Sequence, residues 1–156
     1  MAKITLICGK ICSGKSYIAG KIEGVILNCD ELMTTLFPEP LGDAFDEMGR
    51  RAESYLMNLA ETLTLGGVNV ILDWGFWTRD SRNAAIERFR ARGIETELIY
   101  VEPSERRRLE NIALRNAAFA AGEKGIFEAD EGLLEKCDSR FEPPAPPEVF
   151  TLIRNE

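Results

Sequence analysis

The chain has 156 residues, 45% of them apolar, and a formal net charge of −7. This length suits about one domain, and the acidic balance disfavours a protein that grips a long nucleic acid, because such proteins usually carry a positive field. No apolar run approaches about 18 residues, which excludes a membrane span, and the absence of histidine excludes His-based zinc sites and Ser-His-Asp or Cys-His catalysis.

Short apolar runs alternate with helical stretches along the chain, a pattern typical of an α/β fold with a mainly parallel sheet. The sequence predicts five strands, at residues 3–8, 24–28, 68–72, 96–101 and 149–153. It predicts helices at residues 15–21, 31–36, 43–65, 80–92, 104–121 and 130–137. Asp43 is the expected N-cap of the third helix, and Thr78 or Asp80 that of the fourth.

The chain shows no internal repeat, no low-complexity tail and no domain linker. We therefore expect a single domain over residues 1–156. Its first residues lead directly into an apolar strand and lack the pattern of a signal peptide, so we expect a cytoplasmic protein. In that reducing compartment its cysteines are expected to remain free thiols.

The strongest motif lies between the first strand and the first helix. Residues 9–16 read GKICSGKS and match G-x-x-x-x-G-K-[ST] in full. The glycines let the backbone curl around phosphate oxygens, Lys15 supplies a cation for the β- and γ-phosphates, and the Ser16 hydroxyl reaches Mg²⁺. We expect this segment to bind ATP and Mg²⁺ through Gly9, Lys10, Ile11, Cys12, Ser13, Gly14, Lys15, Ser16 and Tyr17.

Two aspartates follow predicted strands, at the sheet edge where open α/β sheets bind ligands. Phosphoryl transfer to an alcohol needs a carboxylate near the attacking hydroxyl and a second acid that supports Mg²⁺. We assign Asp30 as the acceptor-side base and Asp73, together with Ser16, to the metal site. Three alternatives remain open: Asp30 caps the following helix, Asp73 is a turn residue, or Glu31 is the base.

The helix at residues 104–121 is rich in arginine, whose planar fork binds two phosphoryl oxygens at once. Arg108 and Arg115 are seven residues apart and share a face, so this helix is a candidate lid over ATP. The alternative is a solvated face with charge pairs such as Arg106–Glu110. Arg115 is the better candidate for a catalytic arginine and Arg108 the second.

Arg79 and Arg82 lie just beyond the strand that ends at Asp73. They are candidates for holding the acceptor or the γ-phosphate. The equally weighted alternative is surface charge at the start of a helix.

Together these segments resemble the small P-loop kinases, which have an AAA-like ATP-binding domain and include polynucleotide 5′-kinase domains, chloramphenicol phosphotransferase and the zeta-toxin kinases. The matching segments are the loop 9–16, Asp30 within 28–31, the strand 70–73 followed by Gly75, the helix bearing Arg108, Arg115 and Asn116, and the tail 140–144. The resemblance implies a three-layer P-loop NTPase fold with strand order 2-3-1-4-5. It also implies that Asp30 is the general base and Arg115 a lid arginine.

The leading hypothesis is an ATP-dependent kinase that phosphorylates a hydroxyl of a small molecule. A 5′-end polynucleotide kinase is the second hypothesis; it needs a basic groove leading to Asp30, and the acidic net charge argues against it. The third is an ATP-dependent switch without a phosphoryl acceptor, which would not need the Asp30 carboxylate. The sequence predicts no membrane partner and leaves the oligomeric state and the acceptor undefined.

Overall fold

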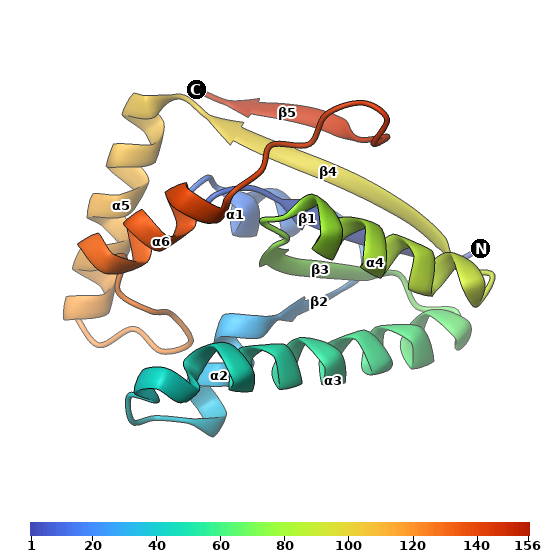
Figure 1. Ribbon diagram of the computed structural model, residues 1–156, viewed down its shortest axis with the longest axis horizontal. Coiled ribbons are helices and arrows are strands. Elements are labelled where there is room, and N and C mark those ends of the chain that lie inside the picture. Colours follow the sequence, from blue (N-terminus) through green and yellow to red (C-terminus); the bar gives the residue numbers. More distant parts are fainter.

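A single five-stranded sheet organises the protein, as the computed structural model of residues 1–156 shows (Figure 1). All neighbouring strands are parallel and their order is β2-β3-β1-β4-β5. The strands are β1 (Lys3–Cys8), β2 (Val25–Asn28), β3 (Val70–Gly75), β4 (Glu95–Pro103) and β5 (Thr151–Asn155). The predicted α/β fold and its strand order 2-3-1-4-5 are confirmed.

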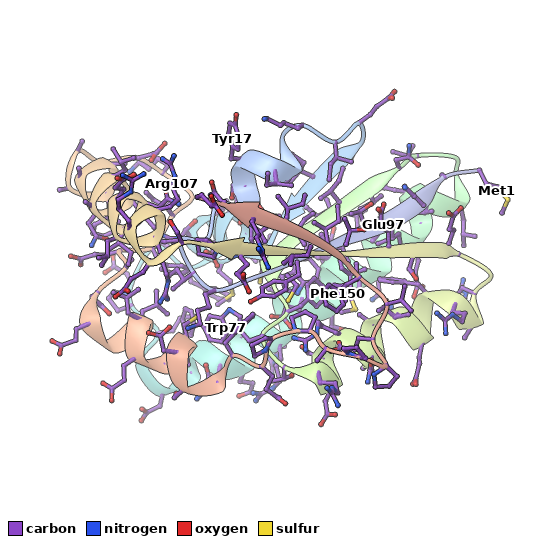
Figure 2. All side chains as sticks on the ribbon, turned by 90° about the horizontal axis from the view of Figure 1, so that it is seen from above. Met1, Tyr17, Trp77, Glu97, Arg107 and Phe150 are labelled. Atoms are coloured by element: carbon purple, nitrogen blue, oxygen red, sulfur yellow. The ribbon has the colours of Figure 1, made fainter.

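Helices cover both faces of this sheet, so the fold has three layers. They are α1 (Lys15–Ala19), α2 (Cys29–Leu36), α3 (Phe45–Leu65), α4 (Arg79–Ala91), α5 (Glu105–Ala120) and α6 (Glu131–Arg140), with a short 3₁₀ turn η1 (Gly42–Ala44) before α3. Side chains of β1 alternate between the faces, as a pleated strand requires. Ile4 and Leu6 pack into the larger core with residues of α3 and α4, whereas Ile7 packs into the smaller core with Ala19 of α1. Figure 2 shows α1 on one side of the sheet and α4 on the other.

The helix starts follow the predicted capping chemistry in part. Thr78 caps α4 by accepting a hydrogen bond from the Ser81 amide, at 3.1 Å, so the alternative cap Asp80 is not used. Asn28, not Asp30, caps α2: its Oδ1 accepts from the Glu31 amide at 2.9 Å. Because the cap lies two residues earlier than Asp30, the Asp30 carboxylate is free of that role.

Two other boundaries differ from the prediction. Asp43 does not cap α3, because it lies inside η1 and makes no side-chain cap hydrogen bond. The last strand begins at Thr151 instead of residue 149, since Val149 is 89% exposed outside the sheet. The strand ends at Asn155, two residues later than predicted, and this places the Asn155 side chain at the carboxyl edge of the sheet. No helix combines the length and the apolar character needed to cross a bilayer.

A buried ion pair fastens the connector before β5 to α4. Arg82 is fully buried, and its guanidinium donates to Glu148 Oε1 at 2.7 Å and Oε2 at 3.1 Å. A third hydrogen bond reaches the Phe76 carbonyl at 2.9 Å. Although burial opposes it, hydrogen bonds from Arg82 and the Ala145 amide hold the pKa of Glu148 below its usual value.

This pair corrects the prediction that Arg79 and Arg82 face an acceptor or the γ-phosphate. Arg79 Nε also lies 3.6 Å from Glu148 Oε2, and neither arginine lines the cleft described below. Both pair with Glu148 instead, because the connector returns over the start of α4.

Replacing Arg82 by Met should lower the free energy of unfolding by about 3–5 kcal/mol, because the Glu148 charge would be left buried without its partner. Urea denaturation measures the change. Arg79→Met is the control: Arg79 is half-exposed, so we expect at most about 1 kcal/mol. An Arg82→Met protein with normal stability but weak binding of ATP or of the phosphoryl acceptor would instead support the prediction that Arg82 binds one of these ligands.

Candidate active site

The loop between β1 and α1 has the conformation of a phosphate cradle. Its first residue, Gly9, donates its amide hydrogen to the Gly75 carbonyl at 3.0 Å, which ties the loop to β3. A Cβ on Gly9 would lie 2.7 Å from Ser13 Oγ and 2.8 Å from the Val101 carbonyl, so only glycine fits. Cys12 and Gly14 have φ values of 63° and 97°, in the left-handed region that curls the backbone.

Three consecutive carbonyls of this loop are held by side chains from other elements. Arg108 Nε donates to the Ile11 carbonyl at 3.1 Å, and Asn111 Nδ2 donates to the Cys12 carbonyl at 3.1 Å. Asn155 Nδ2 donates to the Ser13 carbonyl at 3.0 Å. Carbonyl oxygens must point away from a bound anion, so these donors fix the loop in an anion-binding orientation.

Lys15 stands at the mouth of the loop. Its Nζ donates to the Lys10 carbonyl at 2.7 Å, the same oxygen that accepts the Ser13 amide. Burial lowers the pKa of Lys15, and the nearby Asp73 carboxylate opposes the shift. A desolvated ammonium at this point is suited to bind phosphate oxygens.

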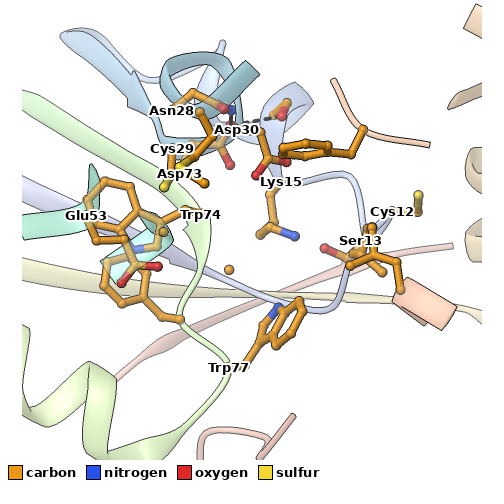
Figure 3. Close-up of a pocket in the computed structure, with 18 of the residues that line it drawn as sticks. Cys12, Ser13, Lys15, Asn28, Cys29, Asp30, Glu53, Asp73, Trp74 and Trp77 are labelled. Atoms are coloured by element: carbon orange, nitrogen blue, oxygen red, sulfur yellow. Dashed lines mark hydrogen bonds between the residues drawn. The ribbon is translucent and has the colours of Figure 1, made fainter. Parts of the chain in front are cut away.

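The carboxylate of Asp73 joins the ends of neighbouring strands. Its Oδ2 accepts from Ser16 Oγ at 2.9 Å and from Asn28 Nδ2 at 3.2 Å, and its side chain is buried (Figure 3). A hydroxyl and a carboxylate are the hard oxygen donors that Mg²⁺ prefers, with waters and phosphates as its other ligands. No group of three acidic, histidine or cysteine side chains is placed to hold a metal ion by itself.

A cleft of about 1170 Å³ opens in front of the loop. Its nucleotide end is lined by the loop and α5, and its other end by α2, α3 and the turn after β3 (Figure 3). Ligand pockets commonly measure about 300–1,000 Å³. The cleft can therefore accommodate a nucleotide together with a second small molecule.

Asp30 projects into this cleft from the first turn of α2 and faces the loop (Figure 3). Its Oδ2 lies 3.5 Å from a guanidinium nitrogen of Arg115, and 47% of the side chain is open to the cleft. Burial in the cleft raises the pKa of Asp30, while the charges of Arg115 and Lys15 lower it in part. Glu31 is exposed and does not line the cleft, so the structure places Asp30 and not Glu31 at the site.

Helix α5 contributes one of its two candidate arginines to the cleft. Arg115 Nε donates to the Phe127 carbonyl at 2.7 Å, and its other end reaches Asp30. Arg108 lies outside the cleft, where it contacts the Ile11 carbonyl and pairs with Asp138 at 2.9 Å. Arg108 therefore holds the loop from outside, whereas Arg115 faces Asp30 in the cleft.

The other predicted loop residues take different places. Lys10 contributes its carbonyl, while its ammonium turns outward to Asp138 at 3.3 Å. Tyr17 lies at the rim, 66% exposed, with Lys21 Nζ 4.3 Å from its ring centroid.

Several site residues escaped the sequence analysis. Asn28 could have been found, because it ends a strand two residues before Asp30. Asn111 lies between the two arginines on α5, but nothing in the sequence marks it as a loop contact. Glu53 and Trp74 line the far end of the cleft, and only the fold brings them there.

Comparison with known proteins places the chain in a family. The sequence profile of a family described as AAA domain matches residues 4–144. The chain belongs to this AAA domain family. The comparison of the chain with curated proteins found no match.

Solved structures share the fold across nearly its whole length. A kinase candidate from Chloroflexus aurantiacus has a TM-score of 0.73 and 18% identity, with 99% of this chain and 87% of that chain covered. Chaetomium thermophilum Kti12 in complex with ADP-AlF3 has a TM-score of 0.70 and 15% identity, covering 97% and 88%. The Mycobacterium tuberculosis APS kinase CysC, in complex with AMPPNP and APS, has a TM-score of 0.63 and 17% identity, covering 98% and 88%. The resemblance of this AAA domain to small P-loop kinases is thus confirmed in its fold.

The contact between Asn155 and the loop can be tested directly. Asn155→Ala should weaken binding of AMPPNP about 3- to 10-fold, because the Ser13 carbonyl loses its donor. Isothermal titration calorimetry measures the affinity. Asn83→Ala, an exposed asparagine of α4, serves as control and should bind normally. Equal affinities for the two variants would show that the loop holds its shape without Asn155.

Proposed function

We propose that this protein is an ATP-dependent phosphotransferase that moves the γ-phosphate of ATP to a hydroxyl group of a small molecule. One observation carries the proposal: Asp30 projects into the cleft opposite the phosphate loop and within reach of Arg115. A protein that only bound or hydrolysed ATP has no need of a carboxylate on the acceptor side of that loop. The fold shared with kinases supports the same interpretation.

The chemistry assigns a task to each group. Asp30 accepts the proton of the acceptor hydroxyl. The oxygen of that hydroxyl forms a bond to the γ-phosphorus of ATP, while the bond between this phosphorus and the bridging oxygen breaks and ADP leaves. Lys15 and Arg115 balance the negative charge on the transferred group. Ser16 and Asp73 would hold Mg²⁺, which supplies further charge neutralisation when it is bound.

Transfer to the 5′-end of a nucleic acid has less support. That reaction needs a basic groove toward Asp30, and Arg79 and Arg82 are committed to Glu148 elsewhere. The acceptor end of the cleft instead presents the carboxylates of Asp30 and Glu53.

Labelling with γ-labelled ATP and Mg²⁺ in a metabolite extract tests the proposal. Wild-type protein should label small metabolites, and Asp30→Asn should reduce that rate about 10²- to 10⁴-fold, because the general base is lost. Binding of AMPPNP should be retained in the variant. Glu31→Gln is the matched control and should label normally, since that side chain is exposed. Release of free phosphate alone, equal in wild type and Asp30→Asn, would support the switch hypothesis instead.

The pH dependence of transfer should report the contact between Arg115 and Asp30. The positive charge of Arg115 lowers the pKa of Asp30, so its removal raises that pKa and reduces the ionised fraction of the base at a given pH. Arg115→Met should therefore move the acidic limb of the kcat/KM profile to higher pH, besides lowering kcat.

Arg106→Met is the control for this profile, because Arg106 is on the same helix with 81% of its side chain exposed. We expect its acidic limb to coincide with that of wild type. A limb that stays in place in Arg115→Met would show that another group is the base.

A further inference from the structure

The acceptor end of the cleft contains a carboxylate that no part of the protein binds. Glu53 lies on the cleft side of α3 and is partly buried, yet it makes no hydrogen bond or ion pair within the protein. Burial raises the pKa of Glu53, the charge of Arg50 lowers it, and that of Asp30 raises it further. Figure 3 shows both carboxylates in the same cleft, Asp30 beside Lys15 and Glu53 farther from the loop beside Trp74.

The surroundings of Glu53 are apolar and open. Trp74 lies beside it and is stacked on Phe76, with ring centroids 5.0 Å apart (Figure 3). Gly49, one turn before Glu53 on α3, also lines the cleft, and a Cβ built there would meet no atom within 4 Å. A glycine inside a helix costs about 1 kcal/mol relative to alanine, and here it keeps the space next to Glu53 clear.

The charges around Glu53 restrict what can bind there. Lys136 and Arg140 also line the cleft, but both pair with Asp46. Arg50 is the remaining cation on this wall; it is exposed at the rim and too far from Glu53 to form an ion pair. The charge of Asp30 is offset by Arg115, 3.5 Å away, whereas Glu53 has no cationic partner, so Glu53 carries the uncompensated negative charge of this end.

An ionised carboxylate only accepts hydrogen bonds, so a ligand beside Glu53 must bring a donor. A hydroxyl and an ammonium both meet this requirement, and either can place its apolar carbon skeleton against the Trp74 ring. A carboxylate or phosphate in the same position would lose its hydration and face a like charge.

We propose that Glu53 selects the phosphoryl acceptor: a hydroxyl compound without net negative charge, whose second donor group, a hydroxyl or an ammonium, binds Glu53 beside Trp74. This inference rests on the proposed phosphotransferase function and adds the class of its acceptor. Asp30 receives the proton of the reacting hydroxyl, while Glu53 orients the molecule by the second group.

The test divides the metabolite extract by charge at pH 7 into cationic, neutral and anionic fractions before labelling with γ-labelled ATP. Wild-type protein should label the neutral fraction if the second donor is a hydroxyl, or the cationic fraction if it is an ammonium. In either case Glu53→Gln should lower kcat/KM for the labelled compound about 10- to 100-fold, mainly through KM, because a hydrogen bond to a charged group is lost.

Two further variants separate acceptor binding from folding. Gly49→Leu should abolish labelling while leaving AMPPNP affinity and thermal stability at or above wild type, because the added side chain enters the cleft from a position that favours helix formation. Glu47→Gln, the same change on the same helix at a residue exposed and paired with Arg51, should label like wild type.

The outcomes distinguish this inference from the proposed function. Label in the anionic fraction, or an unchanged KM in Glu53→Gln, overturns the role of Glu53 while leaving phosphoryl transfer established. The absence of label from every fraction with wild-type protein overturns phosphoryl transfer, and the acceptor class with it.

Discussion

The site depends on the hydrogen bonds that converge on the carboxylate of Asp73. This group ends β3 and accepts from Ser16, which follows β1, and from Asn28, which ends β2. The three strands are neighbours only because β3 lies between β2 and β1 in a parallel sheet, so their carboxyl ends meet at one edge. Hydrogen bonds to a buried carboxylate are among the stronger ones. They fix the positions of Lys15, next to Ser16, and of Asp30, two residues after Asn28.

Helix α5 is attached to this rigid centre in a different way. None of its residues is buried, whereas α3 and α4 bury apolar side chains in the main core. It is held mainly by polar contacts, from Arg108 and Asn111 to the phosphate loop and from Arg115 and Asn116 to the segment before α6. Its one apolar attachment is Ile112, which packs against a small cluster that includes Ile11. Each polar contact contributes a net free energy of only about 0.5–1.5 kcal/mol. The helix can thus separate from the loop at far lower cost than a core helix, as a lid requires.

The features that could be predicted from the sequence are those that short, contiguous sequence patterns determine. The phosphate loop, the strand-end aspartates and the alternation of strands and helices are contiguous signals, and the structure brings Lys15, Asp30 and Asp73 to one edge of the sheet as expected. The position of Arg82 was predicted wrongly, because its partner Glu148 lies 66 residues away in the sequence. An arginine beside a strand end is equally compatible with binding a phosphate and with forming an ion pair inside the protein. Asn155 contacts a carbonyl 142 residues earlier, and no local pattern encodes such a contact. Asn28 and Asp30 are both good caps, and only the backbone conformation at Asn28 decides between them.

In the proposed transfer, Arg115 links α5, the candidate lid, to the base Asp30. Its guanidinium is carried by α5, a helix with no buried residue, yet it is the leading source of positive charge beside Asp30. With the lid closed, that charge favours the ionised carboxylate, the form that can accept a proton from a hydroxyl. With the lid withdrawn, Asp30 would keep its burial against the cleft wall but lose its cation, and its pKa would rise. In the proposed mechanism, the motion that brings Arg115 to the transferred phosphate would also prepare the base, so that a nucleotide under an open lid would meet a poorer proton acceptor.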